Sequence, residues 1–130
     1  MRLMGIDYGS KRVGIAVSDE MGEFALPLIV LKSDKNLIKE IIGITDENKI
    51  KTIILGESKD YKGKANAILP EALNLKRDLE EKGFEVILEP EFMTSANAER
   101  FQGKHDMLDA SAAALILQSY LDRGLLEKIR

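Results

Sequence analysis

The stretch LMGIDYGSKRVGIAVSD, residues 3–19, decides the fold of this chain. Its apolar residues predict two strands, over 2–7 and 12–18, and the second strand has the period-two alternation of a half-buried strand. The short turn 8–11, built on Gly9, joins them, and so short a turn makes the two strands antiparallel. Asp7 closes the first strand, where the fold itself needs no carboxylate. We therefore take Asp7 as a candidate functional residue.

The rest of the chain predicts three more strands and four helices. A third strand over 24–31 contains Pro27, which cannot donate to a ladder, so this strand lies at a sheet edge or carries a bulge. The apolar run 53–55 indicates a strand covered on both faces, and FEVILE, residues 84–89, indicates a fifth. We expect helices from Ser33 or Asp34 to about Asn48, from between Asn66 and Pro70 to a Gly83 cap, from Thr94 or Ser95 to about Phe101, and from about Asp106 to Asp122.

The order of these elements predicts an α/β fold. The first three strands form a meander, and right-handed crossovers through helices place strands four and five parallel to strand one. The sheet is then a five-stranded mixed sheet in the order 3-2-1-4-5, with helices on both faces. A chain of 130 residues is the size of one domain, so we expect a single domain over residues 1–130.

Composition and charge bound the function. The chain has no cysteine, which excludes disulfides and thiolate metal sites. No apolar run approaches the roughly 20 residues of a membrane span, and no secretory signal opens the sequence, so we expect a cytoplasmic protein away from membranes. The formal net charge of −3 is not typical of a nucleic-acid binder, yet basic residues gather locally. They are Lys11, Arg12, Lys59, Lys62 and Lys64, which could form one basic face or simply lie in solvated loops.

Carboxylates follow three strands at the edge where open α/β sheets bind ligands. In the predicted topology the carboxyl ends of strands one, four and five lie side by side. Asp7 ends strand one, Glu57 ends strand four, and Glu89 and Glu91 end strand five. The sequence therefore predicts an acidic cluster at this edge.

The last predicted helix adds two aspartates to the same edge. Asp106 and Asp109 are three residues apart and share a helix face, and the alanines that follow allow this helix to pack closely on the sheet. Two carboxylates about 5 Å apart repel by roughly 3 kcal/mol at an effective dielectric near 20, which favours a cation between them. Oxygen ligands without Cys or clustered His favour Mg²⁺ or Mn²⁺ over zinc. Asp7 is thus predicted to bridge metal ions.

Each carboxylate also has a purely structural interpretation. Asp7 could serve the turn, Asp106 could cap the last helix, and Asp109 could stabilise the helix dipole. Glu57 and Glu89 could be solvated residues at strand ends. The metal-site interpretation rests on the convergence of several of them rather than on any one.

Three segments resemble the YqgF/RuvX family of the RNase H-like superfamily. They are GIDYGSKRVGIAVSD at the start, ALPL at 25–28, and LDASAAALILQSYLD at 108–122. The resemblance covers nearly the whole chain and implies an RNase H-like fold with a metal-dependent nuclease site. The family is associated with maturation of the 5′ end of small-subunit ribosomal RNA and with resolution of Holliday junctions.

The resemblance assigns roles to single residues. Asp7 matches the first-strand aspartate of the family, and Asp109 matches the aspartate that opens its C-terminal signature. In PEFMTSANA, residues 90–98, Glu91 falls on the glutamate of the strand-five motif. Pro90 and Phe92 replace the acidic and basic neighbours that the family has there, which removes an arginine expected to contact phosphate.

The loop after strand four departs from the family pattern. Glu57 falls where the related RuvC-type resolvases place a catalytic glutamate, and those enzymes also carry two aspartates three apart, like Asp106 and Asp109. The expected catalytic set is therefore Asp7, Glu91, Asp109 and Glu57, with Asp106 as a further metal ligand.

The resulting expectation is a nuclease that uses Mg²⁺ or Mn²⁺ on precursor 16S ribosomal RNA or on branched DNA, as a monomer or a homodimer. Gly9 would admit a phosphate close to the backbone, and Lys11, Arg12 and the lysines of loop 58–65 would contact phosphates without reading sequence. Two rivals stay open. One is a catalytically silent module that binds nucleic acid or protein, and the other is an actin-like kinase or ATPase, which needs a second such domain.

Overall fold

The computed structural model describes residues 2–9, 11–57, 69–90 and 108–129, and describes residues 57, 69, 90, 108–109 and 125–129 by their backbone alone. Five strands form one sheet in the order β3-β2-β1-β4-β5. β1 pairs antiparallel with β2, β2 pairs antiparallel with β3, and β4 lies parallel to both β1 and β5. The predicted strand order and directions are confirmed. The strands are β1 (Leu3–Tyr8), β2 (Arg12–Ser18), β3 (Ala25–Lys32), β4 (Thr52–Glu57) and β5 (Glu85–Pro90).

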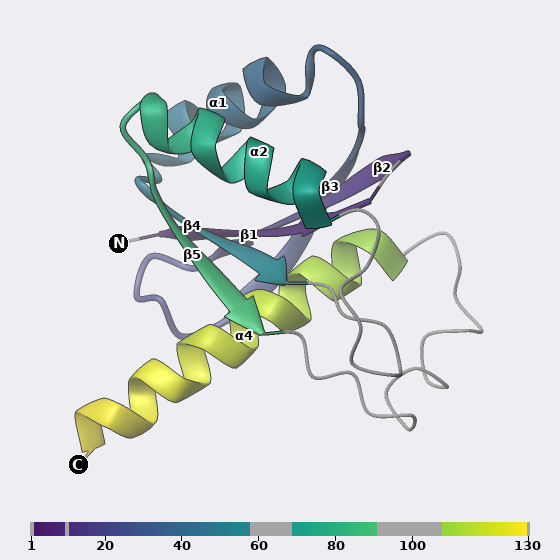
Figure 1. Ribbon diagram of the computed structural model, residues 1–130. Helices are drawn as coiled ribbons and strands as arrows, with labels where there is room; N and C mark the ends of the chain where they lie inside the picture. The colour runs from purple at the N-terminus through teal and green to yellow at the C-terminus, as the bar shows by residue number, and fades with distance from the viewer. Residues whose placement is uncertain (1, 10, 58–68, 91–107, 130) are drawn as a thin grey trace.

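Helices cover the two faces of this sheet. α1 (Leu37–Asn48) and α2 (Leu69–Glu81) lie on one face, and α4 (Leu108–Ile129) crosses the other (Figure 1). The helix predicted over 94–101 lies outside the described residues. None of the helices in the described ranges is long and apolar enough to cross a membrane.

Strand alternation divides the core into two clusters. Met4 and Ile6 of β1 pack under α1 and α2, together with Ala72, Leu75 and Leu79 of α2. Gly5 lies between them and faces α4. The cluster under α4 consists of Ala16, Ile54, Ala113, Ile116, Leu117 and Leu121. Each face of the sheet is thus committed to its own helix layer.

Helix α4 approaches the sheet at positions that lack a side chain. A Cβ placed on Gly5 would lie 2.7 Å from the carbonyl oxygen of Ala113 and 2.8 Å from the Cβ of Leu117. A Cβ on Gly56 would collide with the side chain of Ile116. Both glycines and the fully buried Ala113 let the helix backbone come down onto β1 and β4, as the alanine-rich sequence predicted.

Two predicted helix boundaries are wrong. α1 begins at Leu37 with Asn36 as its N-cap, because the Asp34 carboxylate accepts a hydrogen bond of 2.9 Å from the Asn36 backbone N–H and holds the chain in a turn there. α4 does not end at Asp122 but continues to Ile129. Gly124 does not adopt a positive φ and so does not cap the helix there.

Other local predictions are confirmed. β3 is an edge strand, and its register with β2 shifts next to Pro27, so that Ile15 faces Ile29 while Ala16 faces Pro27. Gly83 has φ of 99° just after α2, which is the left-handed conformation of a C-terminal cap.

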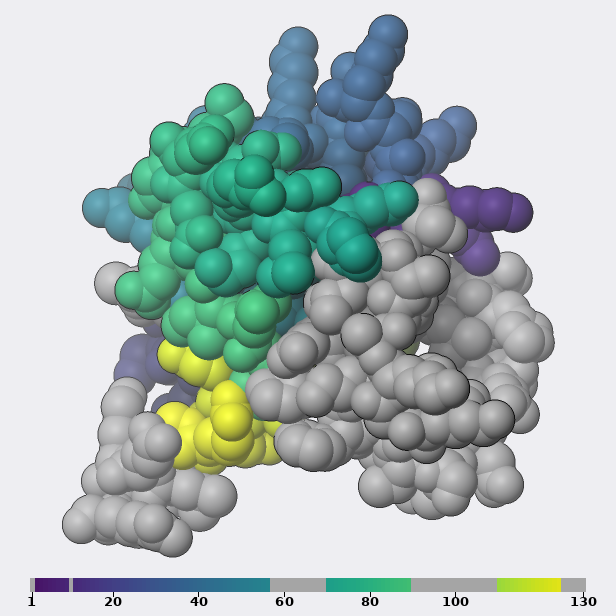
Figure 2. All heavy atoms as spheres, viewed as in Figure 1, coloured from purple at the N-terminus to yellow at the C-terminus, as the bar shows by residue number. Residues whose placement is uncertain are grey.

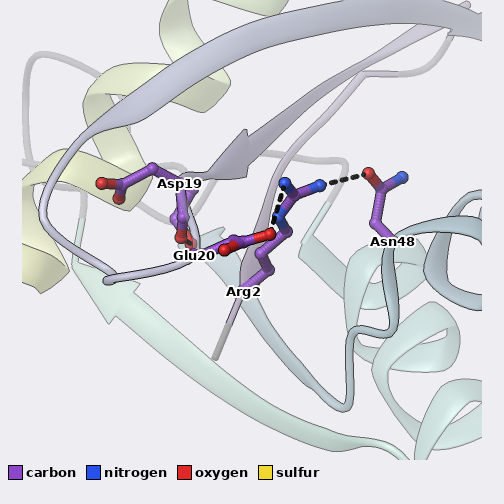
Figure 3. Close-up of polar contacts among 5 residues, drawn as sticks. Arg2, Asp19, Glu20 and Asn48 are labelled. Carbon is purple, nitrogen blue, oxygen red and sulfur yellow. Dashed lines mark hydrogen bonds and ion pairs between the residues drawn. The ribbon is translucent and has the colours of Figure 1, made fainter.

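Arg2 joins three elements at the amino end of β1. Its guanidinium donates a hydrogen bond of 3.1 Å to Oδ1 of Asn48, at the end of α1, and lies 3.5 Å from the carboxylate of Glu20 (Figure 3). Because the Glu20 side chain is 84% exposed, this ion pair stabilises the fold by well under about 1 kcal/mol.

The connection between β2 and β3 is held by Asp19. Its Oδ1 accepts hydrogen bonds from the backbone N–H groups of Glu23, at 2.8 Å, and Phe24, at 3.1 Å. Its own N–H donates to the carbonyl of Phe24, and Gly22 turns the chain with φ of 71°. These backbone hydrogen bonds, that of Phe24 first, lower the pKa of Asp19 below its ordinary value of 3.8.

Gly5→Ala is expected to lower the free energy of unfolding by about 2 kcal/mol, because the added methyl group forces α4 away from β1. Gly43→Ala is the matched control. No atom lies within 4 Å of a Cβ at that helical position, so this variant should gain up to about 1 kcal/mol. Urea unfolding followed by circular dichroism measures both. A Gly5→Ala variant as stable as the wild type would show that α4 does not pack this closely.

Asp19→Ala is expected to destabilise the protein at neutral pH. Asp19 has a folded-state pKa below its unfolded value, so its stabilisation is present above pH 3.8 and is lost as pH falls through the folded pKa. Melting temperatures of the wild type and the variant should therefore differ at pH 7 and converge in acid. A difference that stays constant with pH would contradict the role of the ionised carboxylate.

Candidate active site

Asp7 lies at the carboxyl end of β1, on the face that carries α4. Its Cα pairs with Gly14 of β2, and its side chain is partly buried. Because side chains alternate along a strand, Asp7 shares its face with Leu3 and Gly5, which pack against α4. The predicted site residue therefore points away from α1 and α2.

Tyr8 occupies the opposite face at the same end of β1. Its hydroxyl accepts a hydrogen bond of 3.3 Å from Ser33 and donates one of 3.4 Å to Glu71. These residues line a depression of about 340 Å³ beneath the amino ends of α1 and α2. The sheet thus separates Asp7 from the carboxylates of this depression.

The first turn of α4 lies at the same end of the sheet as Asp7. Gln118 accepts a hydrogen bond of 2.8 Å from the backbone N–H of Ala25, and Ala25 pairs with Ser18 of β2. The Ser18 hydroxyl in turn accepts a hydrogen bond from the backbone N–H of Leu3, at the amino end of β1. The later part of α4 therefore lies at the amino end of β1, so the helix runs in the opposite direction to the strand. Position 109 lies one helical turn before Ala113, a distance of about 6 Å along the helix axis. Asp7 lies two residues after Gly5, a distance of about 7 Å along the strand. Both steps lead to one end of one face.

The strand-end glutamates are placed by register. Glu57 ends β4 and pairs with Pro90 of β5, so Glu91 is the next residue in the chain after a partner of Glu57. Glu91 and Asp106 lie outside the described residues, as do the lysines at 59, 62 and 64.

Glu89 does not belong to the acidic set. It is 2% exposed, and its carboxylate pairs with Arg123 and accepts a hydrogen bond of 3.3 Å from Ser119. The interpretation of Glu89 as a solvated strand-end residue is therefore wrong. Figure 2 shows α4 emerging directly beside β5 on this side of the molecule. The sequence concealed the pair because the predicted helix ended one residue before Arg123.

Basic side chains stand near the Asp7 end of β1. Lys11 and Arg12 are exposed in the turn between β1 and β2, as a phosphate contact requires. Arg12 lies opposite Lys32 of β3, a basic neighbour that only the β2–β3 register reveals. A Cβ on Gly9 would collide with the carbonyl of Arg12, so the hairpin itself requires this glycine.

The donor set suits a hard cation. Asp7 is the one predicted metal ligand whose side chain the structure describes, and the chain offers carboxylates but no thiolates. No three His, Asp or Glu side chains within the described ranges gather closely enough to bind a metal.

The sheet order, the position of Asp7 on the central strand and the helix across its face define an RNase H-like fold. Two solved structures show the same fold. RuvC from Thermus thermophilus is 16% identical, with 96% of both chains covered and a TM-score of 0.62. The resolvase of fowlpox virus, solved with Holliday junction DNA, is 17% identical over 96% of this chain and 99% of that chain, with a TM-score of 0.59.

The profile described as "RuvX: Holliday junction resolvase" matches residues 1–123. A relative from Sulfurihydrogenibium sp. is 33% identical over 94% of this chain and 90% of its own length, and one from Acetivibrio thermocellus is 36% identical over 94% and 96%. Both carry the name "Putative pre-16S rRNA nuclease". The chain belongs to the RuvX family, which confirms the resemblance seen in its motifs.

Arg123→Ala is expected to lower the free energy of unfolding by about 2 kcal/mol, because it leaves the buried Glu89 carboxylate without its cation. Adding Glu89→Gln should recover part of this loss, since a neutral amide tolerates burial better. Arg77→Ala, on the exposed side of α2, is the control and should change stability by less than about 0.5 kcal/mol. Urea unfolding of the wild type, Arg123→Ala, Glu89→Gln and the double variant gives the coupling energy. Equal losses for Arg123→Ala and Arg77→Ala would mean that the pair does not form.

Proposed function

We propose that this protein is a divalent-metal-dependent nuclease that hydrolyses phosphodiester bonds in nucleic acid. The substrate is the 5′ region of precursor 16S ribosomal RNA or, as the second candidate, branched DNA, and the compartment is the cytoplasm. The observation that carries the proposal is the backbone placement of Asp7 and position 109 at one end of the α4 face. Names of the relatives support the RNA substrate, and the family description supports the DNA substrate.

Asp7 and Asp109 would hold one or two Mg²⁺ or Mn²⁺ ions, with a glutamate completing the set. Glu91 ranks before Glu57 in this role, because Glu91 falls on the glutamate of the family's strand-five motif. Asp106 would serve as an outer ligand. When bound, such a cation lowers the pKa of a water molecule and neutralises charge on the scissile phosphate.

The remaining residues bind and orient the substrate. Asp7 lies on β1, the central strand, which pairs with a strand on each side. The backbone that carries its carboxylate therefore needs little rearrangement when a ligand binds. Lys11 and Arg12 would contact backbone phosphates from the exposed turn beside it, and Gly9 keeps that turn tight. Lys59, Lys62 and Lys64 would contact further phosphates along the same nucleic-acid strand. Binding of this kind is salt-dependent and insensitive to sequence.

Asp7→Asn and Asp109→Asn are each expected to reduce cleavage by about 100-fold or more, because each removes a ligand charge while keeping the shape. Asp46→Asn, on the exposed side of α1, should keep full activity. The assay offers precursor ribosomal RNA and a four-way DNA junction in parallel, with Mg²⁺ or Mn²⁺. Thermal unfolding and nucleic-acid affinity should stay near wild-type values in all three variants.

A metal titration separates this proposal from a silent binding module. Wild-type protein should bind Mn²⁺ in a manner weakened by Asp7→Asn, and Glu91→Gln should weaken it more than Glu57→Gln. Full cleavage by Asp7→Asn would falsify the catalytic assignment. Nucleic-acid binding without cleavage of either substrate, and without Mn²⁺ binding, would identify a binding module instead.

A further inference from the structure

An apolar patch covers the exposed edge of the sheet. Leu26, Leu28 and Ile29 of β3 are 56%, 48% and 43% exposed, and Phe24 and Met21 just before the strand are 63% and 77% exposed. We call these five side chains the β3 patch. Exposed apolar side chains scattered singly are ordinary, but five within residues 21–29, on one edge strand and the turn before it, indicate an interaction surface.

The exposure follows from how the strand is built. Ala25, at one end, packs against the α4 cluster, and Leu31, at the other, packs against the cluster under α1 and α2. Between them residues 26–29 are exposed, because β3 is the edge strand of the sheet. The register shift beside Pro27 also leaves Leu28 without a partner in β2. The middle of β3 is therefore free on its outer side within the described structure.

The β3 patch is held in place rather than loose. Asp19 accepts hydrogen bonds from Glu23 and Phe24 and so fixes the connection that carries Met21 and Phe24. From α4, Gln118 donates to the carbonyl of Glu23 at 3.0 Å and accepts from Ala25 at 2.8 Å. Apolar groups held in a fixed arrangement lose little conformational entropy when a partner covers them.

Charges at the two ends of this segment make it complementary to itself. Residues 24–31 carry no charge, while Glu23 precedes them and Lys32 follows them. If two β3 segments lie antiparallel about a two-fold axis between Pro27 and Leu28, Glu23 of each copy meets Lys32 of the other.

We propose that a second copy of this chain covers the β3 patch, with the two β3 strands antiparallel about this axis. At about 200 Å² for a fully exposed large side chain, the patch offers roughly 500 Å² per copy. Two copies bury about 1,000 Å² from these side chains alone, close to the lower limit of about 1,200 Å² for a stable interface. Pro27 lacks an N–H and Leu28 is out of register, so side-chain packing rather than a continuous ladder joins the copies.

The absence of cysteine from the chain gives a direct test. In the full-length protein, Leu28→Cys puts one thiol beside the proposed axis, and oxidation should link it to its counterpart in most molecules. Leu73→Cys, 41% exposed on α2, is the matched control and should stay largely unlinked. Sedimentation of the wild type should give a mass near twice the 14.5 kDa of one chain. Leu28→Asp should raise the dissociation constant at least about 100-fold.

Charge reversal tests the register. Glu23→Lys and Lys32→Glu should each weaken the dimer about fivefold to tenfold, and the double variant should restore it, because the pairs are exchanged across the axis. A wild type that sediments as one chain, equal linking of Leu28→Cys and Leu73→Cys, or a double variant weaker than both singles would overturn the proposal. These measurements do not depend on nuclease activity, so the outcome is distinguishable from failure of the proposed function.

Discussion

The close approach of α4 to β1 at Gly5 is the constraint on which the rest of the structure depends. Without a side chain at that position, the helix backbone packs directly against the central strand. This contact buries Ala113 and Leu117, fixes the direction of the helix across the sheet, and carries its first turn to the end where β1 finishes. The same placement brings Arg123, three turns later, to the buried carboxylate of Glu89.

Strand alternation then sorts the acidic residues. Two consecutive residues at the end of β1 lie on opposite faces of the sheet. Asp7 lies on the α4 face, while the Tyr8 hydroxyl forms hydrogen bonds with Ser33 and Glu71 on the other face. The structure thus separates Asp7, on the α4 side, from Glu71, on the opposite side, and pairs the buried Glu89 with Arg123.

Much of the fold could be predicted because the signals are local. The turn at Gly9 fixes the first hairpin, Pro27 marks the edge strand, and the crossover rule orders the remaining strands. The errors arise where a side chain acts on distant or irregular backbone. Asp34 shifts the start of α1 to Leu37, because its side chain stabilises a turn that competes with the helix. Glu89 pairs with Arg123, which lies beyond the predicted end of the last helix at Asp122. A charged residue at a strand end can be buried only when it has a partner of opposite charge. The periodic pattern of apolar residues in the sequence does not identify that partner.

Helix α4 comes last in the described chain, after all five strands. A ribosome completes residues 3–90 before position 109 exists, and the strands can pair as they emerge, since domains fold largely in the order of synthesis. The Asp7 face of the sheet then stays bare until the helix arrives. A polypeptide that stops before α4 therefore lacks half of the proposed acidic pair.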